Sequence, residues 1–233
     1  MADMTLVIAD KNYSLWPLSA WLCLRTAGLE FEEVLIRFTD PDRRAKMLEW
    51  GPTGRVPVLH HDGRVIWDSL AICEYVADLV PDARLWPVEA GARAVARAFS
   101  AQMHATGSTY PGAVRHIIFA LDTNVRRRTA PVTPDPKVQE SIDHLIAMWR
   151  RLRRQYGANG PFLLGHFTIA DAMSAHLVNR LVTYAIAVPD DIAAYIDAMR
   201  AQPAMQRWIA EATAEDWILP SAEIEVAQSP TPA

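Results

Sequence analysis

Long hydrophobic runs are missing from this sequence. The apolar stretches fall well short of the ~20 residues that a membrane-spanning helix needs. The N-terminus MADMTLVIAD also has no charged segment followed by a long apolar core, as a secretory leader would. We therefore expect a soluble cytoplasmic protein with no membrane partner.

Cysteine is scarce as well. Cys23 and Cys73 are the only two in the chain, and both lie within apolar helical patterns far apart in the sequence. This distribution indicates neither a disulfide framework nor a zinc-ligand set, so each is predicted to be a small buried hydrophobic residue. We expect no bound metal.

Neither sign of charge dominates. Charged residues make up 21% of the 233 residues, and the formal net charge is −4. This balance gives no indication of a nucleic-acid partner. The hydrophobic content of 51% is enough to fill a sizeable core. The composition thus predicts a globular protein and names no ligand.

Two strand-like runs enclose a helical pattern near the N-terminus. Residues 5–9 (TLVIA) and 31–38 (FEEVLIRF) are short and rich in strand-forming residues. Between them apolar residues recur at helical spacing, Pro17 suits a first helical turn, and Gly28 stands where a left-handed helix cap is wanted. This order predicts a parallel βαβ unit.

The next segment predicts a hairpin followed by a helix. Residues 41–50 are compatible with a helix, and residues 56–60 and 65–67 are short strand candidates on either side of an Asp-Gly turn. A periodic apolar run then begins at Ser69 and ends before Pro81. Residues 1–80 are therefore predicted to form one α/β domain with the order βαβαββα.

The rest of the chain lacks strand alternation. A linker is predicted at 81–87, a helical domain at 88–220 and a loosely ordered tail at 221–233. Helical patterns cover residues 88–122, 136–156, 169–186, 189–200 and 203–214. The predicted second domain is therefore an all-α helical bundle.

Ser14 lies where the first strand ends and the first helix begins. In α/β units, ligands gather at the carboxyl ends of strands, where helix N-termini present unpaired N–H groups and a partial positive charge. A hydroxyl at this place either caps the helix or donates a hydrogen bond to a bound anion. The position alone leaves both interpretations open.

Two further positions have a similar character. The Val56-Pro57 bond, at the entrance of a strand, is a candidate cis peptide that would present the backbone of Val56 to a peptide-like ligand. At the start of the next helix, the Ser69 hydroxyl and the free N–H groups suit a carboxylate, and Asp68 suits an ammonium group. The alternative for Asp68 and Ser69 is a plain helix cap.

These motifs, in this order, resemble a known family. NYS (12–14), GRVPVL (54–59) and WDSLAICEY (67–75) are similar to the N-terminal thioredoxin-like domain of cytosolic glutathione S-transferases. LLGHFTIADAMSA (163–175) resembles the segment of their helical domain in which a Thr-x-x-Asp box caps a core helix. The resemblance covers residues 5–215 and is to the serine-type bacterial members.

The resemblance implies a role for each residue of the site. Ser14 takes the position of the catalytic serine that activates the glutathione thiol. Pro57 takes the position of the cis-proline, and Val56 that of the residue that bonds the cysteinyl backbone of glutathione. Asp68 and Ser69 match the residues that hold the γ-glutamyl head group.

The sequence departs from some members of the family. It has no Cys at the junction of strand and helix and no Cys-x-x-Cys, so the disulfide chemistry of the cysteine-type classes lacks its nucleophile. Leu15 and Trp16 follow Ser14, so the Ser-Ser-Cys run of the zeta class is absent and the likeness to that class stops at the serine. Tyr13 is the alternative hydroxyl, because tyrosine-type classes exist.

The resemblance also implies an electrophile pocket and a subsite for the glycine carboxylate of glutathione. The candidates for the electrophile pocket are Tyr13, Trp16, His104 and Tyr110, although a lone histidine is more often a surface or packing residue. The candidates for the carboxylate subsite are Lys46 and Arg55, beside Arg43 and Arg44. Nothing in the sequence chooses among these cations.

Two groups of polar residues are predicted to be structural. Thr168 and Asp171 match the capping box of the family, which is a folding element. Arg126, Arg127 and Arg128 form a basic run that a solvated loop explains better than a binding surface does.

The predicted function is conjugation of the glutathione thiolate to a small hydrophobic electrophile, as in detoxification. A free thiol of pKa ~8.5 is mostly protonated at neutral pH, so a hydroxyl that lowers this pKa raises the reactive fraction. The alternatives are a glutathione-dependent isomerase or dehalogenase, and a non-catalytic glutathione-binding module. Glutathione is the expected co-substrate, and a homodimer is the expected assembly.

Overall fold

The computed structural model describes residues 4–105 and 114–223. Within these residues one mixed sheet has the strand order β2-β1-β3-β4, and β1 pairs with β2 in parallel and with β3 in antiparallel direction. The strands are β1 (Met4–Ile8), β2 (Glu32–Leu35), β3 (Val58–His61) and β4 (Arg64–Trp67). The hairpin between β3 and β4 turns at Asp62 and Gly63, which both have positive φ, as the Asp-Gly signal predicts.

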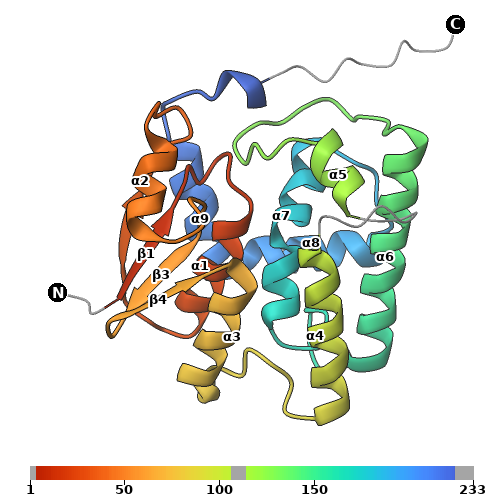
Figure 1. The fold of residues 1–233 in the computed structure, drawn as a ribbon. Coiled ribbons are helices and arrows are strands. Elements are labelled where there is room, and N and C mark those ends of the chain that lie inside the picture. Colours follow the sequence, from red (N-terminus) through yellow and green to blue (C-terminus); the bar gives the residue numbers. More distant parts are fainter. Residues whose placement is uncertain (1–3, 106–113, 224–233) are drawn as a thin grey trace, which may run out of the picture.

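Three helices flank the sheet and complete the predicted order βαβαββα (Figure 1). They are α1 (Trp16–Thr26), α2 (Arg43–Trp50) and α3 (Ser69–Leu79). Alternate residues of β1 face opposite sides of the sheet: Leu6 and Ile8 join the main core with α1 and α3, whereas Val7 packs in a smaller cluster with Met47 of α2. The sheet is therefore covered on both faces.

Helix α1 lies between the sheet domain and the second domain. It packs against α3 on one side and α7 (Ile169–Thr183) on the other, and every residue from Pro17 to Leu24 is buried. The Ser19 hydroxyl donates a hydrogen bond of 2.9 Å to the carbonyl of Ala172 on α7. A helix buried on opposite sides needs no polar stripe, which explains why α1 is apolar almost all round.

The two cysteines are buried between α1 and α3, as predicted. Cys23 and Cys73 are free thiols, and neither is exposed to solvent. Burial raises the pKa of Cys73 well above its usual value, and a hydrogen bond with Cys23 raises it further. The Cys73 thiol therefore stays protonated, and both buried cysteines act as packing groups.

The second domain is an all-α bundle, as predicted. Besides α7, its helices in the described part of the chain are α4 (Ala90–His104), α5 (Arg115–Ala120), α6 (Pro136–Tyr156), α8 (Asp190–Ala201) and α9 (Pro203–Ala214). The predicted capping box is present at the start of α7: Asp171 accepts from the backbone N–H of Thr168 at 2.9 Å and from its hydroxyl at 3.0 Å. Figure 1 shows the bundle beside the sheet domain, with α7 at its centre.

The prediction of one helix across residues 88–122 is wrong. Helix α4 ends at His104, Ala105 leaves helical geometry at φ −75° and ψ 64°, and α5 begins only at Arg115. The intervening sequence TGSTYPG contains two glycines and a proline. Glycine and proline disfavour a helix interior, so this composition was a signal against one continuous helix. Residues 106–113 lie outside the described part of the chain.

The predicted linker is a packed segment. Residues Pro81–Ala83 form a 3₁₀ turn, and Arg84 follows in the left-handed region. Leu85 and Trp86 are buried, the carbonyl of Leu85 accepts from the N–H of Ile169, and the indole of Trp86 donates to Glu74. These contacts attach the segment to both domains.

The first three residues of the predicted loose tail lie in the described part of the chain. Pro220–Ala222 form a second 3₁₀ turn, and the Glu223 carboxylate accepts from the side chains of Tyr13, Asn124 and Arg126. Residues 221–223 are therefore held in place, contrary to the prediction. The remainder of the predicted tail lies outside the described residues.

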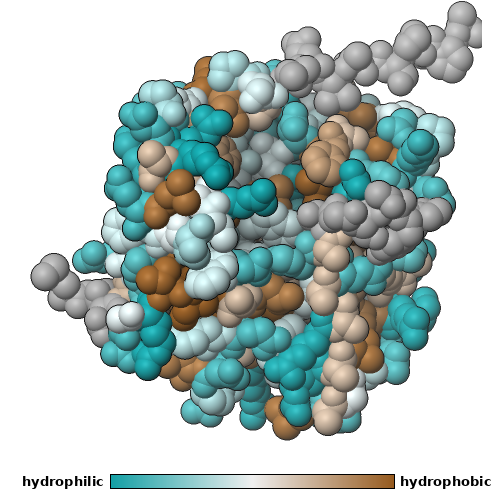
Figure 2. All heavy atoms as spheres, viewed as in Figure 1, coloured by the Kyte–Doolittle hydropathy of each residue, from teal (hydrophilic) through white to brown (hydrophobic). Residues whose placement is uncertain are grey.

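None of the helices in the described part of the chain combines the length and the hydrophobicity that a bilayer-spanning helix requires. On the face shown in Figure 2, apolar side chains form separate patches among polar ones.

Candidate active site

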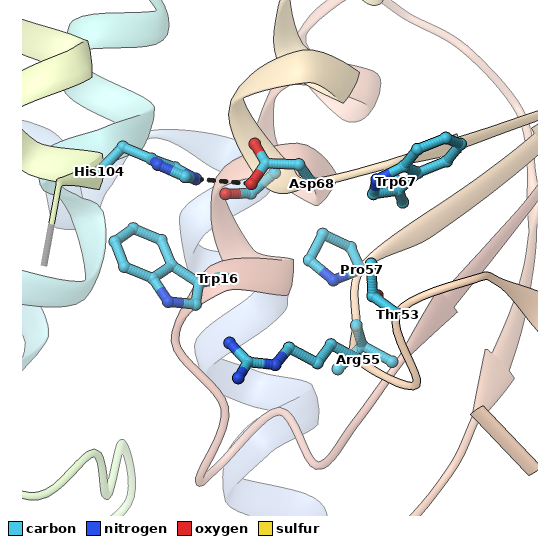
Figure 3. A pocket seen from close by; sticks show the side chains of 9 residues that line it. Trp16, Thr53, Arg55, Pro57, Trp67, Asp68 and His104 are labelled. Atoms are coloured by element: carbon cyan, nitrogen blue, oxygen red, sulfur yellow. Dashed lines mark ion pairs between the residues drawn. The ribbon is translucent and has the colours of Figure 1, made fainter. Parts of the chain in front are cut away.

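Two neighbouring cavities lie along the carboxyl end of β1 and the loop before β3, and both are lined by Trp16, Arg55 and Val56. The first cavity has a volume of about 390 Å³ and is also lined by Thr53, Pro57, Trp67, Asp68, Ser69 and His104 (Figure 3). The second has a volume of about 400 Å³ and is also lined by Tyr13, Ser14, Leu15, Phe38, Arg43, Arg44, Met47 and Gly54. The five residues to which the sequence assigns catalysis and glutathione binding all line these cavities.

Ser14 lies on the wall of the second cavity. Its backbone N–H donates 2.8 Å to the carbonyl of Asp10, which closes the turn between β1 and α1. The helix begins only at Trp16, Leu15 occupies the cap position, and no side chain caps this helix end. The Ser14 hydroxyl therefore has no capping role, and no described residue hydrogen-bonds to it.

Tyr13, the alternative hydroxyl, is occupied elsewhere. Its hydroxyl donates to Glu223 at 2.6 Å and accepts from Arg126 at 2.7 Å. Burial raises the pKa of Tyr13, and the hydrogen bond to Glu223 raises it further, so the phenol stays protonated. The geometry favours Ser14 as the hydroxyl that faces a ligand.

The loop that carries both hydroxyls is held by the end of the chain. The buried carboxylate of Glu215 accepts from the backbone N–H groups of Lys11 (2.7 Å) and Asn12 (3.0 Å). Arg126 donates to the carbonyls of Glu215 and Trp217. Arg126 is therefore half-buried and fully engaged, and its prediction as part of a solvated loop is wrong.

The Val56-Pro57 peptide bond is cis, as the sequence indicated. It precedes β3, and Pro57 is buried while Val56 is half-buried. The backbone N–H and C=O of Val56 make no hydrogen bond to another described residue. An extended peptide placed along the cavities would meet a free donor and a free acceptor here.

Asp68 caps α3 and reaches across the first cavity. It adopts φ 79° and ψ 130°, and one carboxylate oxygen accepts from the N–H groups of Leu70 (3.0 Å) and Ala71 (3.4 Å). The other oxygen lies 2.8 Å from Nε2 of His104 (Figure 3). Burial raises the pKa of Asp68, but the hydrogen bond and charge of His104 outweigh it, so the pKa is lowered overall.

Ser69 is the first residue of α3 and is 2% exposed. Its buried hydroxyl has no hydrogen-bond partner among the described residues. A buried hydroxyl without a partner is uncommon because it carries an uncompensated desolvation cost. The cap of α3 is thus Asp68, and the Ser69 hydroxyl, on a residue that lines the first cavity, takes no part in it.

Of the four candidate cations, three line the cavities. Arg55 lines both, and Arg43 and Arg44 line the second. Figure 3 shows Arg55 extending toward Trp16 on the side of the first cavity opposite Asp68. Lys46 instead pairs with Asp40, which raises the pKa of Lys46, and it lines neither cavity. The structure favours Arg55 over Lys46 as an anion-binding group.

The candidates for the electrophile pocket do not all line the same cavity. Trp16 lies where the two cavities meet, and His104 lines the first cavity in its bond with Asp68. Tyr13 belongs to the hydrogen-bonded loop, and Tyr110 lies outside the described residues. Tyr13 also lines the second cavity, so the three described candidates are distributed over two adjoining cavities that share Trp16.

Behind Trp16, helix α7 carries two buried basic side chains that the sequence did not single out. The ring of His176 contacts Trp16 at a centroid distance of 5.0 Å, and Arg180 bonds to Nδ1 of His176 at 3.0 Å. Burial lowers the pKa of Arg180 to about 10, and burial and then the charge of Arg180 lower that of His176 well below its usual value. His176 is therefore neutral at physiological pH, and Arg180 is charged.

Thr53 and Trp67 also escaped the sequence reasoning. Both line the first cavity, and Trp67 is 47% exposed. Trp67 precedes Asp68 directly, and Thr53 precedes the cis turn by a few residues, so proximity to the motifs was the available signal. Among the described residues, no three His, Cys, Asp or Glu side chains gather as a metal site would require.

The comparisons with known proteins agree with this geometry. The sequence of residues 13–79 matches the family of the glutathione S-transferase N-terminal domain. A glutathione transferase homologue from Burkholderia (BGR1), crystallised with bound glutathione, has 25% sequence identity and a TM-score of 0.65 over 91% of this chain and 98% of its own. The N-terminal domain therefore matches the glutathione S-transferase family, and the chain shares the fold of these proteins. In this fold the cis turn and α3 form one wall of the two cavities, and the β1–α1 loop forms the other.

Shorter stretches of the sequence resemble curated proteins. LigF of Sphingobium sp. strain SYK-6 is 40% identical over 80 residues, which are 31% of this chain and 30% of that protein. A probable maleylacetoacetate isomerase of Caenorhabditis elegans is 35% identical over 92 residues, 38% of this chain and 43% of that protein. The chain therefore matches less than half the length of these curated relatives. A glutathione S-transferase from the clam Laternula elliptica has the same fold, with a TM-score of 0.69 at 19% identity over 92% of this chain and 96% of its own.

Proposed function

We propose that this chain is a glutathione-dependent enzyme that conjugates the thiolate of glutathione to an apolar electrophile. The observation that carries the proposal is a row of unoccupied polar groups along the two cavities. The Ser69 hydroxyl, the backbone of Val56 and the Ser14 hydroxyl have no partner among the described residues, and all three line the cavities. Their order matches a tripeptide with its head group at Ser69, its middle residue at Val56 and its thiol near Ser14.

The electrostatics of the second cavity favour an anion. Ser14 precedes the N-terminus of α1, where unpaired N–H groups give a partial positive charge, and Arg43, Arg44 and Arg55 add full charges. A thiol of pKa ~8.5 is ionised to only a few per cent at pH 7, and a pKa lower by about 2 would ionise most of it. The Ser14 hydroxyl donates to the thiolate, which attacks an electrophilic carbon while the leaving group departs with the bonding electrons. The three arginines also serve the glycine carboxylate.

Trp16 and the bundle form the other side of the reacting region. Trp16 is half-buried, joins the two cavities and is supported by His104 and His176. An apolar electrophile is therefore proposed to lie against the Trp16 ring, between the sheet domain and the bundle.

Isomerisation is the second candidate, because one curated relative is named a probable maleylacetoacetate isomerase. The same thiolate would add to the substrate and leave again, so glutathione would be regenerated. Conjugation consumes one glutathione for each product. A non-catalytic binding module would consume no glutathione and, unlike an isomerase, would form no product.

The test combines binding and turnover. Isothermal titration with glutathione should give a saturable one-site isotherm, and the protein should then conjugate 1-chloro-2,4-dinitrobenzene with loss of one glutathione for each chloride released. Binding without turnover of aryl halides or of a cis-enone isomerase substrate would favour the module. Absence of binding would contradict the proposal. Light scattering would test the predicted homodimer against the 26.0 kDa of one chain.

A further inference from the structure

The carboxylate of Asp68 has a histidine as its partner across the edge of the first cavity. One of its oxygens accepts from the start of α3, and the second lies 2.8 Å from Nε2 of His104. Under the proposed function, this second oxygen is the one that the ammonium group of glutathione would meet. Figure 3 shows the His104 ring directed at this oxygen across the edge of the cavity.

His104 is held in this place by the other domain. It is the last residue of α4, and its ring packs on Trp16 at a centroid distance of 5.2 Å. Its side chain is 33% exposed and that of Asp68 41%, so water and protons reach the pair. The head-group end of the cavity is thus built from both domains.

The charge on His104 decides what Asp68 offers to a ligand. A neutral imidazole donates one N–H to the carboxylate and leaves it negative. A protonated imidazole neutralises the carboxylate and places a positive charge beside the ligand's ammonium group. Histidine is the side chain that ordinarily changes charge between about pH 5 and 8.

Five other ionisable side chains lie on the elements that surround this cavity. They are Arg97 and Glu74, which pair with each other, Arg55 across the cavity, and His176 and Arg180 of α7 behind Trp16. The raised pKa of Arg97 keeps it cationic, and burial keeps His176 neutral. The pKa of Asp68 is lowered, chiefly by the hydrogen bond and charge of His104 against the opposing effect of burial, so its carboxylate ionises more readily than that of a free aspartate.

We propose that His104 is a positioning residue that makes recognition of the ligand's ammonium group depend on pH, weakening it when the imidazole is protonated. This inference rests on the proposed function, because it assigns the head group of glutathione to the cavity of Asp68 and Ser69. It adds a residue of the helical domain to the recognition of the head group.

The experiment uses S-methylglutathione, whose sulfur does not ionise, so that the thiol adds no pH dependence. Isothermal titration of the wild type between about pH 7.0 and about pH 5.5 should show affinity falling roughly tenfold, the size of one favourable charge interaction lost. The analogue with a glutaryl group in place of the γ-glutamyl group lacks the ammonium and should bind with nearly constant affinity over this range. This comparison of two ligands uses the wild-type protein alone.

Three variants complete the test. His104→Gln retains a donor for Asp68 without titrating, and its affinity for S-methylglutathione should stay at the neutral wild-type level at both pH values. His104→Lys carries a permanent charge and should bind weakly at both. His166→Gln, at a histidine that bonds the carbonyl of Arg84 outside the cavities, is the matched control and should behave as wild type.

The outcomes separate the two proposals. If S-methylglutathione does not bind the wild type at either pH, the proposed function fails. If it binds without the acid-induced loss, or if His104→Gln or the glutaryl analogue shows the same loss as wild type with S-methylglutathione, the role of His104 is refuted while glutathione binding stands.

Discussion

Two neighbouring parts of this molecule differ in whether their polar groups have hydrogen-bond partners. In the loop after β1, the side chains or N–H groups of Asp10, Lys11, Asn12 and Tyr13 are bonded to the segment that follows α9. On the cavity walls, the hydroxyls of Ser14 and Ser69 and the Arg55 guanidinium have no partner among the described residues. The hydrogen-bonded Tyr13 hydroxyl and the unpartnered Ser14 hydroxyl belong to adjacent residues.

The contrast distinguishes structural groups from binding groups. A buried polar group that loses its partner costs about 1–3 kcal/mol, so the bonded loop contributes to stability. Groups left without partners contribute little to stability and are free to bond a ligand. Asn12 is a partial exception, because its side-chain oxygen accepts from Arg126 while its amide nitrogen is buried without a partner.

Removing the Glu215 carboxylate should give the largest effect on stability. Glu215→Ala leaves the N–H groups of Lys11 and Asn12 without an acceptor, and we expect the free energy of unfolding to fall by about 3 kcal/mol. Glu215→Gln keeps one acceptor oxygen and should lose about half as much. Urea denaturation measures both, and a loss below about 1 kcal/mol in the alanine variant would contradict the structural role of this network.

Asp171 is a hydrogen-bonded buried group in the helical bundle, and it makes the stability of the protein depend on pH. Its buried carboxylate accepts from Leu163, Thr168 and Tyr195, yet burial raises its pKa from 3.8 to about 6. The folded protein therefore binds a proton more tightly than the unfolded chain, and this contribution to stability is present at low pH and lost as pH rises through about 6.

The pH effect of Asp171 is measured against Asp171→Asn, in which the other carboxyl groups are unchanged. The wild type should be more stable relative to the variant at about pH 4.5 than at about pH 7.5, by about 2 kcal/mol. A difference that is the same at both pH values would show that Asp171 is not desolvated as the structure has it.

Most of the fold, and the segments that carry the site residues, could be predicted from local sequence. Pro17, Gly28, the Asp-Gly turn and the Thr168 box are signals written within a few residues, and the structure confirms the elements that they predict. The cis bond before β3 is of the same kind. The end of α4 at His104 was not predicted, because apolar residues recur at helical spacing on both sides of it.

The remaining features depend on contacts between distant residues. Glu215 meets Lys11 across 204 positions, and Arg126 meets Tyr13 across 113. The bond of His104 to Asp68 requires the docking of α4 against α3. No short pattern announces which charges will meet when two domains pack, so a basic run such as Arg126–Arg128 looks like a solvated loop.

The hydroxyls of the adjacent residues Tyr13 and Ser14 allow a direct test of the difference between structural and binding groups. Tyr13→Phe removes the bonds to Glu223 and Arg126 and should lower the free energy of unfolding by about 1.5 kcal/mol, without changing the pKa of the bound glutathione thiol. Ser14→Ala should leave stability within about 0.5 kcal/mol. It should raise the pKa of that thiol by about 1 to 2, because the thiolate loses its donor.

The thiol pKa is read from the ultraviolet absorbance of the bound thiolate as a function of pH. Turnover of an aryl halide just below neutral pH should fall with the thiolate fraction in Ser14→Ala and remain near wild type in Tyr13→Phe. The reverse pattern would assign the chemistry to Tyr13.

Ser69→Ala gives the smallest expected effect and separates binding from folding most cleanly. The hydroxyl is buried and unpartnered in the chain without ligand, so its removal should leave stability unchanged or raise it by a few tenths of a kcal/mol. Under the proposed function the same hydroxyl bonds the head-group carboxylate, and its loss should weaken glutathione binding by roughly tenfold, about 1.4 kcal/mol. A hydroxyl that served only to cap α3 would give the opposite result, a less stable protein with unchanged affinity, and calorimetry on one pair of proteins measures both quantities.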